Sequence, residues 1–153
     1  VFGGSGPEPI KGRDTYFNEL WILDLWNQTW IKVTDAIGTY PTPRSYHTAT
    51  LVNNMIYFVG GMNTTTTHMD IHSFNIDTHM WSEIDMGNKG PLPLYGHSAI
   101  VSPWYLPSCY PRVYIYGGKK SAELLSDRKV WMLNIEARKW EVRVSKPITP
   151  GTL

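Results

Sequence analysis

The sequence predicts an all-β fold built from repeated units of short antiparallel strands. Aromatic and β-branched runs end in a double glycine three times, at Gly3-Gly4, Gly60-Gly61 and Gly117-Gly118. A second apolar run follows each of them, and a tryptophan stands six residues after the Asp24, Asn75 or Asn134 near its end, at Trp30, Trp81 and Trp140. No segment shows a sustained apolar period of about 3.6 residues, which an amphipathic helix would require. Repetition of this kind predicts a repeat architecture before composition is considered.

The first unit, residues 1–34, is predicted to contain three strands. Residues 1–4 form the end of one strand, and a polar loop follows over residues 5–18. Strands at 20–25 and 30–33 then flank a tight turn, because β-branched and aromatic runs bounded by Asn, Gly and Pro are typical of hairpins. The linker over residues 34–44 contains two prolines.

The second unit, residues 45–86, is predicted to contain four strands. They cover residues 45–52, 55–61, 70–76 and 80–85, with Asn53-Asn54 as a two-residue turn, since Asn tolerates positive φ. The run Ile56-Tyr57-Phe58-Val59 is apolar at consecutive positions. A strand with one solvent-exposed face would alternate between apolar and polar residues, so this strand is expected to be covered on both faces.

The third unit, residues 95–145, repeats the second. Its lead-in matches that of the second unit in register, so that Pro91 and His97 correspond to Pro41 and His47. The turn after its first strand is long and proline-rich, over residues 103–111, and strands are predicted at 112–118, 129–135 and 139–144. Residues 146–153 are expected to lead toward a further unit.

Composition restricts the function classes. The 153 residues carry a net charge of +1 without a clustered basic face, which argues against nucleic-acid binding. No run approaches the roughly 18 apolar residues of a membrane span. Cys109 is the single cysteine, so neither an internal disulfide nor a multi-cysteine zinc site is possible within these residues. We expect no metal and no cofactor.

The double glycines, the six-residue step to tryptophan and the Pro-x-Pro-x-x-x-His lead-in resemble the kelch repeat over the whole chain. The resemblance implies blades of a β-propeller. It implies structural roles for the double glycines, for the three tryptophans packed against them, and for His47 and His97 hydrogen-bonded within a blade. The chain would then supply three strands of one blade and two full blades. The remaining blades are expected from the same polypeptide or another chain.

The loops are the expected site of function. Those between the second and third strands (5–19, 62–69, 119–128) and between blades (34–45, 86–96) should emerge on one face. Tyrosine and arginine dominate interface energetics, so the predicted partner-binding residues there are Arg13, Tyr16, Phe17, Tyr40, Arg44 and Tyr95. In kelch substrate adaptors, loop-face arginines bind acidic peptides; here Arg44 has Leu94 as its counterpart, while Lys11 and Arg13 keep this interpretation open. We expect a non-catalytic protein- or peptide-binding module, as the recognition part of an adaptor or scaffold.

Two alternatives remain open from the sequence. A propeller-type enzyme would need His or carboxylates gathered at one place; His68, His72 and His79 lie near one another in sequence, and Cys109-Tyr110 invites comparison with copper radical oxidases. An extracellular module of the attractin type would fit the glycosylation sequons at Asn27 and Asn63. The single cysteine slightly favours an intracellular location instead.

Overall fold

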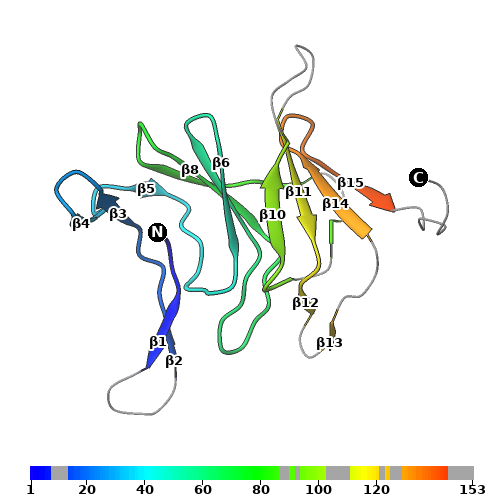
Figure 1. The fold of residues 1–153 in the computed structure, drawn as a ribbon, viewed down its shortest axis with the longest axis horizontal. Coiled ribbons are helices and arrows are strands. Elements are labelled where there is room, and N and C mark those ends of the chain that lie inside the picture. Colours follow the sequence, from blue (N-terminus) through cyan, green and yellow to red (C-terminus); the bar gives the residue numbers. More distant parts are fainter. Residues whose placement is uncertain are drawn as a thin grey trace, which may run out of the picture.

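The computed structural model describes residues 1–7, 14–86, 90–91, 94–102, 111–120, 123–124 and 129–144. Over these ranges the fold is all-β, and three units lie side by side in chain order (Figure 1). The predicted fold class and the repeated antiparallel units are therefore confirmed. Within the described residues, no helix has the length and apolar character needed to cross a bilayer.

The second unit is a meander with an additional strand at its outer edge. Its strands are β6 (Thr48–Val52), β7 (Met55–Val59), β8 (Ile71–Asn75) and β9 (Met80–Glu83), paired antiparallel in sequence order. β5 (Ile37–Gly38), in the predicted linker, pairs parallel with β9. The linker thus hydrogen-bonds to a strand edge that would otherwise be open, which the sequence analysis did not anticipate.

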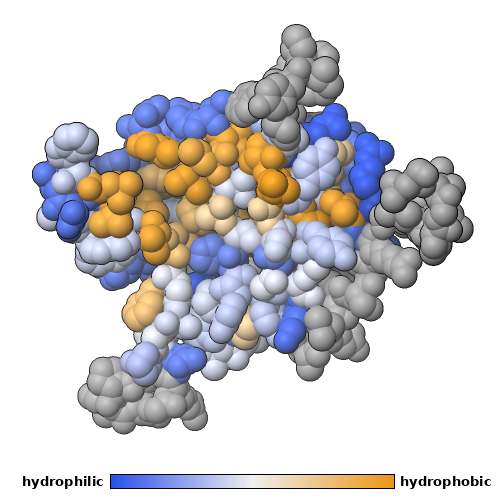
Figure 2. Space-filling view, in the orientation of Figure 1, coloured by the Kyte–Doolittle hydropathy of each residue, from blue (hydrophilic) through white to orange (hydrophobic). Residues whose placement is uncertain are grey.

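The third unit has the predicted four strands in the predicted order. They are β10 (Ser98–Val101), β11 (Arg112–Tyr116), β14 (Lys129–Asn134) and β15 (Lys139–Val144). β10 lies next to β6 of the second unit (Figure 1), so the first strands of successive units are neighbours. Apolar residues gather in a band over these strands and β3 (Figure 2). Leu51 of β6 and Ile100 of β10 are exposed.

The first unit contains β3 (Trp21–Asp24) and β4 (Thr29–Lys32), and a bridge from Phe2 to Leu20 attaches residues 1–4 beside β3. The expected polar loop after these residues is partly a two-stranded ribbon, β1 (Ser5–Pro7) and β2 (Asp14–Tyr16). A similar short ribbon, β12 (Lys119–Lys120) and β13 (Glu123–Leu124), follows the third double glycine. Two of the loops expected between second and third strands, over residues 5–19 and 119–128, therefore contain short paired strands that the sequence analysis did not predict.

The six-residue step to each tryptophan is a hairpin turn closed by its first residue. Asp24 Oδ1 accepts hydrogen bonds from the backbone N–H groups of Trp26 and Asn27, at 2.8 and 3.2 Å. Asn75 and Asn134 accept equivalent bonds in their own turns. The fifth residue of each turn has positive φ: Gln28, His79 and Arg138, at 53, 52 and 49°. A short polar side chain that mimics a turn therefore explains why this position is Asp or Asn.

The core is divided between the two junctions that join successive units. At the first junction, Trp81 packs against Phe2 of the first unit, with ring centroids 5.1 Å apart, and is 1% exposed. At the second, Trp140 joins a cluster with Val59 and Ile71 of the second unit and is 5% exposed. Each buried tryptophan thus packs on the preceding unit. Trp30 is 53% exposed, contrary to the expectation of burial, because the described chain places no preceding unit beside it.

Candidate functional site

The first glycines of the first two pairs, Gly3 and Gly60, lie where one unit meets the next. A Cβ at Gly60 would lie 2.6 Å from the backbone oxygen of Leu94 and 3.1 Å from the ring of His97. A Cβ at Gly3 would meet Arg44 O and His47 in the same way, at 2.6 and 3.2 Å. The first glycine of a pair therefore faces the histidine of the following unit. The nearest atoms are backbone oxygens and histidine rings, and not the tryptophans that the family resemblance suggested.

His97 connects the first strands of two units. Its Nε2 lies 2.9 Å from Thr48 Oγ1 of the second unit. Burial, and to a smaller extent the nearby His47, lowers the pKa of His97 to about 4. His47 is similarly affected: burial and then the charge of Arg44 lower its pKa to about 4. Both rings are therefore neutral at pH 7. The His97 bond joins two units and does not lie within one blade as the resemblance implied, while the His47 ring packs against Phe2 and Phe58.

Arg44 is buried inside the second unit, which removes it from the set of accessible partner-binding residues. Its side chain is 1% exposed, and its guanidinium donates to Gly60 O at 3.0 Å and to Thr42 O at 3.0 Å. Nη1 and Nη2 also donate to the two carboxylate oxygens of Asp70, the second at 2.8 Å. Every donor nitrogen of Arg44 has a partner within the chain, so this side chain is not accessible to a partner molecule, although the sequence analysis placed it among the partner-binding residues.

Asp70 is the counter-ion of this buried arginine. His72 Nε2 lies 3.1 Å from Asp70 Oδ2, and His72 Nδ1 lies 3.2 Å from Thr39 O. Burial raises the pKa of Asp70, but hydrogen bonds from Arg44 and His72 and the charge of Arg44 outweigh it, so that the pKa lies well below its usual range. The cluster holds the lead-in of the second unit against β8.

The loops between second and third strands project from one side of the sheets. The β1–β2 ribbon, the loop over residues 62–67 and the β12–β13 ribbon all lie at the bottom of Figure 1. We call this side the loop face; it also includes the lead-in residues 44–46 and 94–96. Backbone bonds join these parts across the units, from Arg44 N to Phe17 O at 3.0 Å and from Gly96 N to Tyr46 O at 2.9 Å. The loops are therefore held together.

The expected partner-binding residues differ in exposure, and not all of them lie on the loop face. Phe17 is exposed, and Tyr16 and Tyr95 are half-buried. Tyr40 is exposed but lies elsewhere, with its hydroxyl bonded to Ala36 O and its ring 5.9 Å from that of Trp81. Arg13 lies outside the described residues. Whether Tyr16, Phe17, Tyr40 and Tyr95 bind a partner stays a prediction.

Tyr46 is a loop-face residue that the sequence analysis did not select. Its side chain is 61% exposed, and its ring centroid lies 6.2 Å from that of Tyr95. Its φ of 57° is in the left-handed region, and the equivalent residue of the third unit, Gly96, has φ 64°. Alignment of Ser45-Tyr46-His47 with Tyr95-Gly96-His97 was the available signal, because glycine in one repeat marks a positive φ in the other.

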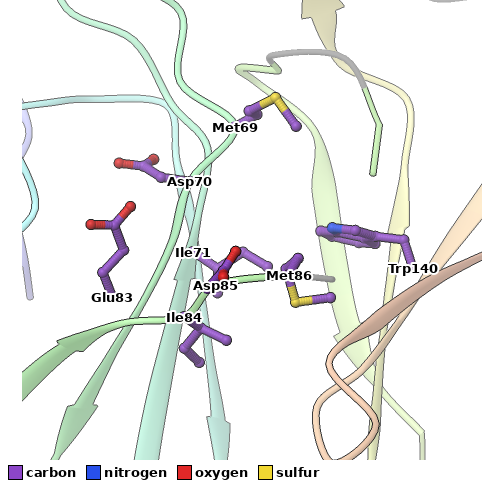
Figure 3. Close-up of a pocket in the computed structure, with 8 residues that line it drawn as sticks. All are labelled: Met69, Asp70, Ile71, Glu83, Ile84, Asp85, Met86 and Trp140. Carbon is purple, nitrogen blue, oxygen red and sulfur yellow. The ribbon is translucent and has the colours of Figure 1, made fainter. Parts of the chain in front are cut away.

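A cavity of about 570 Å³ opens at the second junction. Its walls come from the start of β8, the end of β9 and the start of β15, and consist of Met69, Asp70, Ile71, Glu83, Ile84, Asp85, Met86 and Trp140. In Figure 3 the carboxylates of Asp70 and Glu83 extend to the same side, and Asp85 lies between Glu83 and Trp140 in the view. The lining therefore combines three carboxylates with two thioethers and an indole.

Comparison with known proteins identifies the repeat. The family model described as the KLHDC2/KLHL20/DRC7 Kelch-repeats domain matches residues 1–152. The chain belongs to the kelch-repeat family. Its all-β architecture is the one that the sequence predicts. Kelch repeats typically serve protein–protein interaction.

Several curated relatives share the kelch segment. The chain is 30% identical over 148 residues to Acyl-CoA-binding domain-containing protein 5 of Arabidopsis thaliana, covering 95% of the chain and 20% of that protein. It is 30% identical over 154 residues to human Host cell factor 2, covering 88% of the chain and 18% of the relative. Human Kelch domain-containing protein 1 is 28% identical over 137 residues, covering 88% and 32%. The chain thus spans less than a third of each.

The residues considered for enzyme chemistry are only partly placed. His68, His72 and His79 bond to different partners: His68 lies 3.5 Å from Thr42 Oγ1, His72 bonds to Asp70, and His79 Nδ1 lies 2.8 Å from Asp35 Oδ1. In the part of the chain that the structure describes, no three His, Cys, Asp or Glu side chains gather as metal ligands would. The Cys109-Tyr110 pair lies outside the described residues.

Proposed function

We propose that this kelch chain is part of a non-catalytic module whose loop face docks a protein or peptide partner. Tyr46 carries the proposal, because its side chain is exposed while its backbone is strained. A side chain in the left-handed region costs about 1–2 kcal/mol, and the chain's own repeat avoids that cost with Gly96. Strained residues of this kind are concentrated at functional sites.

The surroundings of Tyr46 fit a docking surface. Tyr95 lies beside it, and Phe17 presents a further exposed ring from the end of the β1–β2 ribbon. Tyrosine and phenylalanine supply large contact areas with few side-chain torsions to order on binding. Because the backbone bonds described above hold these loops together, the aromatic surface is preorganised, which lowers the entropic cost of binding.

The relatives support a module within a larger assembly. Host cell factor 2 and the Acyl-CoA-binding domain-containing proteins match this chain over 18% to 20% of their lengths, so the kelch segment accompanies much other sequence in them. On that basis we propose the role of a recognition part in an adaptor or scaffold. The sequons at Asn27 and Asn63 are what favours the extracellular attractin-type alternative, and no described residue specifically favours the propeller-type enzyme.

Affinity capture with the intact protein tests the docking surface. Proteins that bind the wild type should be lost with Tyr46→Gly and with Phe17→Ala. They should be retained with Trp26→Ala, which removes an exposed aromatic side chain from a hairpin turn away from the loop face. Tyr46→Gly should leave the melting temperature unchanged or higher, since it relieves the strained φ. Unchanged capture by both loop-face variants, measured by quantitative mass spectrometry, would refute the proposal.

A further inference from the structure

The two junctions are built from equivalent positions, offset by the 51 residues that separate Trp30 from Trp81. A cavity of about 240 Å³ at the first junction is lined by Asn18, Glu19, Leu20, Lys32, Val33, Ala36, Tyr40 and Trp81. Glu19, Leu20, Lys32 and Val33 correspond to Asp70, Ile71, Glu83 and Ile84 around the larger cavity. The strand register is also shared, with Trp21 opposite Lys32 and His72 opposite Glu83. The first junction therefore serves as an internal reference for the second.

At the first junction, an ammonium group of the chain itself lies against the carboxylate. Lys32 Nζ forms an ion pair with Glu19 Oε1 and lies 5.7 Å from the centroid of the Trp21 ring. Trp21 Nε1 donates to the other oxygen of the Glu19 side chain at 3.0 Å. This arrangement binds a cation between a carboxylate and an aromatic ring.

At the second junction the carboxylate and its supporting donor are kept, but the cation is replaced by an acid. Asp70 and His72 stand where Glu19 and Trp21 stand, and their side chains are joined in the same way, at 3.1 Å. Glu83 occupies the place of Lys32, and Asp85 occupies the place of Thr34. Arg44 balances only Asp70. Glu83 and Asp85 make no ion pair among the described residues, so within that part of the chain their negative charge has no counter-ion.

The second cavity also has room that the first lacks. Counting from the matched Pro41 and Pro91, Tyr40 corresponds to Gly90. The Tyr40 ring lies beside Trp81 at the first junction, whereas a Cβ at Gly90 would lie 2.3 Å from Trp140 Nε1. The close approach of the backbone to the indole therefore excludes a side chain there, and the cavity is more than twice as large as its counterpart.

We propose that the second-junction cavity binds a lysine or arginine side chain presented by a partner polypeptide. Glu83 and Asp85 receive the ammonium or guanidinium group. Asp70, the position equivalent to Glu19, is already paired with Arg44. The alkyl stem lies along Met69 and Met86, since long basic side chains cover apolar surface while their charged ends stay at the edge. This inference rests on the proposed docking function and gives the partner its chemistry: a basic segment, and not the acidic peptide suggested by Arg44.

Glu83→Lys is the decisive variant, because it copies the arrangement of Lys32 and supplies the cavity with its own ammonium group next to Asp70. The probes are short fluorescein-labelled Gly/Ser peptides with one central lysine, arginine or N-acetyl-lysine, titrated into the intact protein by fluorescence anisotropy. We expect the lysine and arginine peptides to bind, and Glu83→Lys to weaken them by about tenfold or more. The acetylated peptide lacks the charge, so the wild type should bind it no more tightly than Glu83→Lys binds the lysine peptide.

Glu136→Lys is the matched control, since it makes the same charge change on an exposed turn that does not line the cavity. It should change the affinity by less than about twofold. Equal weakening by Glu136→Lys and Glu83→Lys would show attraction to net charge alone and overturn the proposal, as would equal binding of the acetylated peptide. Tighter binding of spermidine than of any peptide would assign the cavity to a free polyamine and also reject a polypeptide ligand.

The experiments can refute the loop-face proposal and the cavity proposal independently of each other. If captured proteins are lost with Tyr46→Gly but retained with Glu83→Lys, the loop face docks a partner and the cavity takes no part in it. If basic peptides bind through Glu83 while capture is insensitive to Tyr46 and Phe17, the cavity binds cations and the loop-face proposal is wrong. Circular dichroism of each variant confirms that folding is intact.

Discussion

Replacing Asp70 by asparagine should destabilise the fold because it leaves a buried guanidinium without its counter-ion. Arg44 is 0% exposed, and its Nη2 lies 2.8 Å from Asp70 Oδ2. Two unit charges about 4 Å apart interact with about 4 kcal/mol at an effective dielectric constant of about 20. Removing one member of a buried pair costs about 3–5 kcal/mol. Since the Asp70 side chain is partly exposed, we expect a loss of about 3 kcal/mol, at the lower end of that range.

Urea denaturation at pH 7 measures this loss, with Glu83→Gln as the control. That variant also converts a carboxylate to an amide, but Glu83 has no ion pair in the described chain, so its effect should stay below about 0.5 kcal/mol. Equal midpoints for Asp70→Asn and Glu83→Gln would show that the buried pair contributes nothing, and the account of the second unit would be wrong.

The Asp70 contribution also has a defined pH dependence. Because the folded state lowers the pKa of this carboxyl, the stabilisation is present above the unfolded pKa of about 4 and is lost as pH falls through the folded value. The difference between wild type and Asp70→Asn should therefore shrink in strong acid. A difference that grows on acidification would mean that the pKa of Asp70 is raised in the folded state.

Two further outcomes follow from the junctions. Gly60→Ala should lower the free energy of unfolding by well over the roughly 1 kcal/mol of strain expected at its positive φ, because its Cβ would lie 2.6 Å from a backbone oxygen of the next unit. Gly96→Ala is the control: it has a similar φ and no atom within 4 Å, so it should cost only the strain. Equal shifts in melting temperature for the two variants would contradict the close approach at Gly60. His97 has a folded pKa of about 4 against the ordinary 6.5, so its stabilisation is complete above pH 6.5 and is lost toward pH 4, by up to about 3 kcal/mol. His97→Gln should reduce this acid destabilisation in urea titrations, and an unchanged slope would refute the role of the ring.

The strand plan was predictable because it depends on local chemistry. Alternating turns and apolar runs determine where β6 to β9 begin and end, and the double glycine marks the close approach between units before any partner is known. The Asn75 turn is equally local, since the side chain bonds to backbone groups two and three residues later. Features of this kind depend on neighbours in sequence, which is why they repeat with the unit.

The partner-binding set was less predictable because exposure depends on contacts between distant residues. Arg44 looks like a loop-face cation in the sequence, but Asp70 is 26 residues away and pairs with it only after β7 and β8 fold together. Trp30 has the same local pattern as Trp81, yet only Trp81 has a preceding unit to pack on in the described chain. Ribbons such as β1–β2 were missed because polar residues dominate them.

Comparison between repeats separates structural positions from functional ones in a way that burial alone does not. A position that is the same in every unit, such as the double glycine, is explained by packing. A position whose chemistry reverses, such as Lys32 against Glu83, keeps the backbone geometry and changes what the site can bind. The reversal does not improve the ion pairing of the described residues, because the first junction pairs Glu19 with Lys32 whereas Glu83 and Asp85 have no ion pair there. In this kelch chain, the units share a scaffold, and recognition is expected where one unit departs from the others.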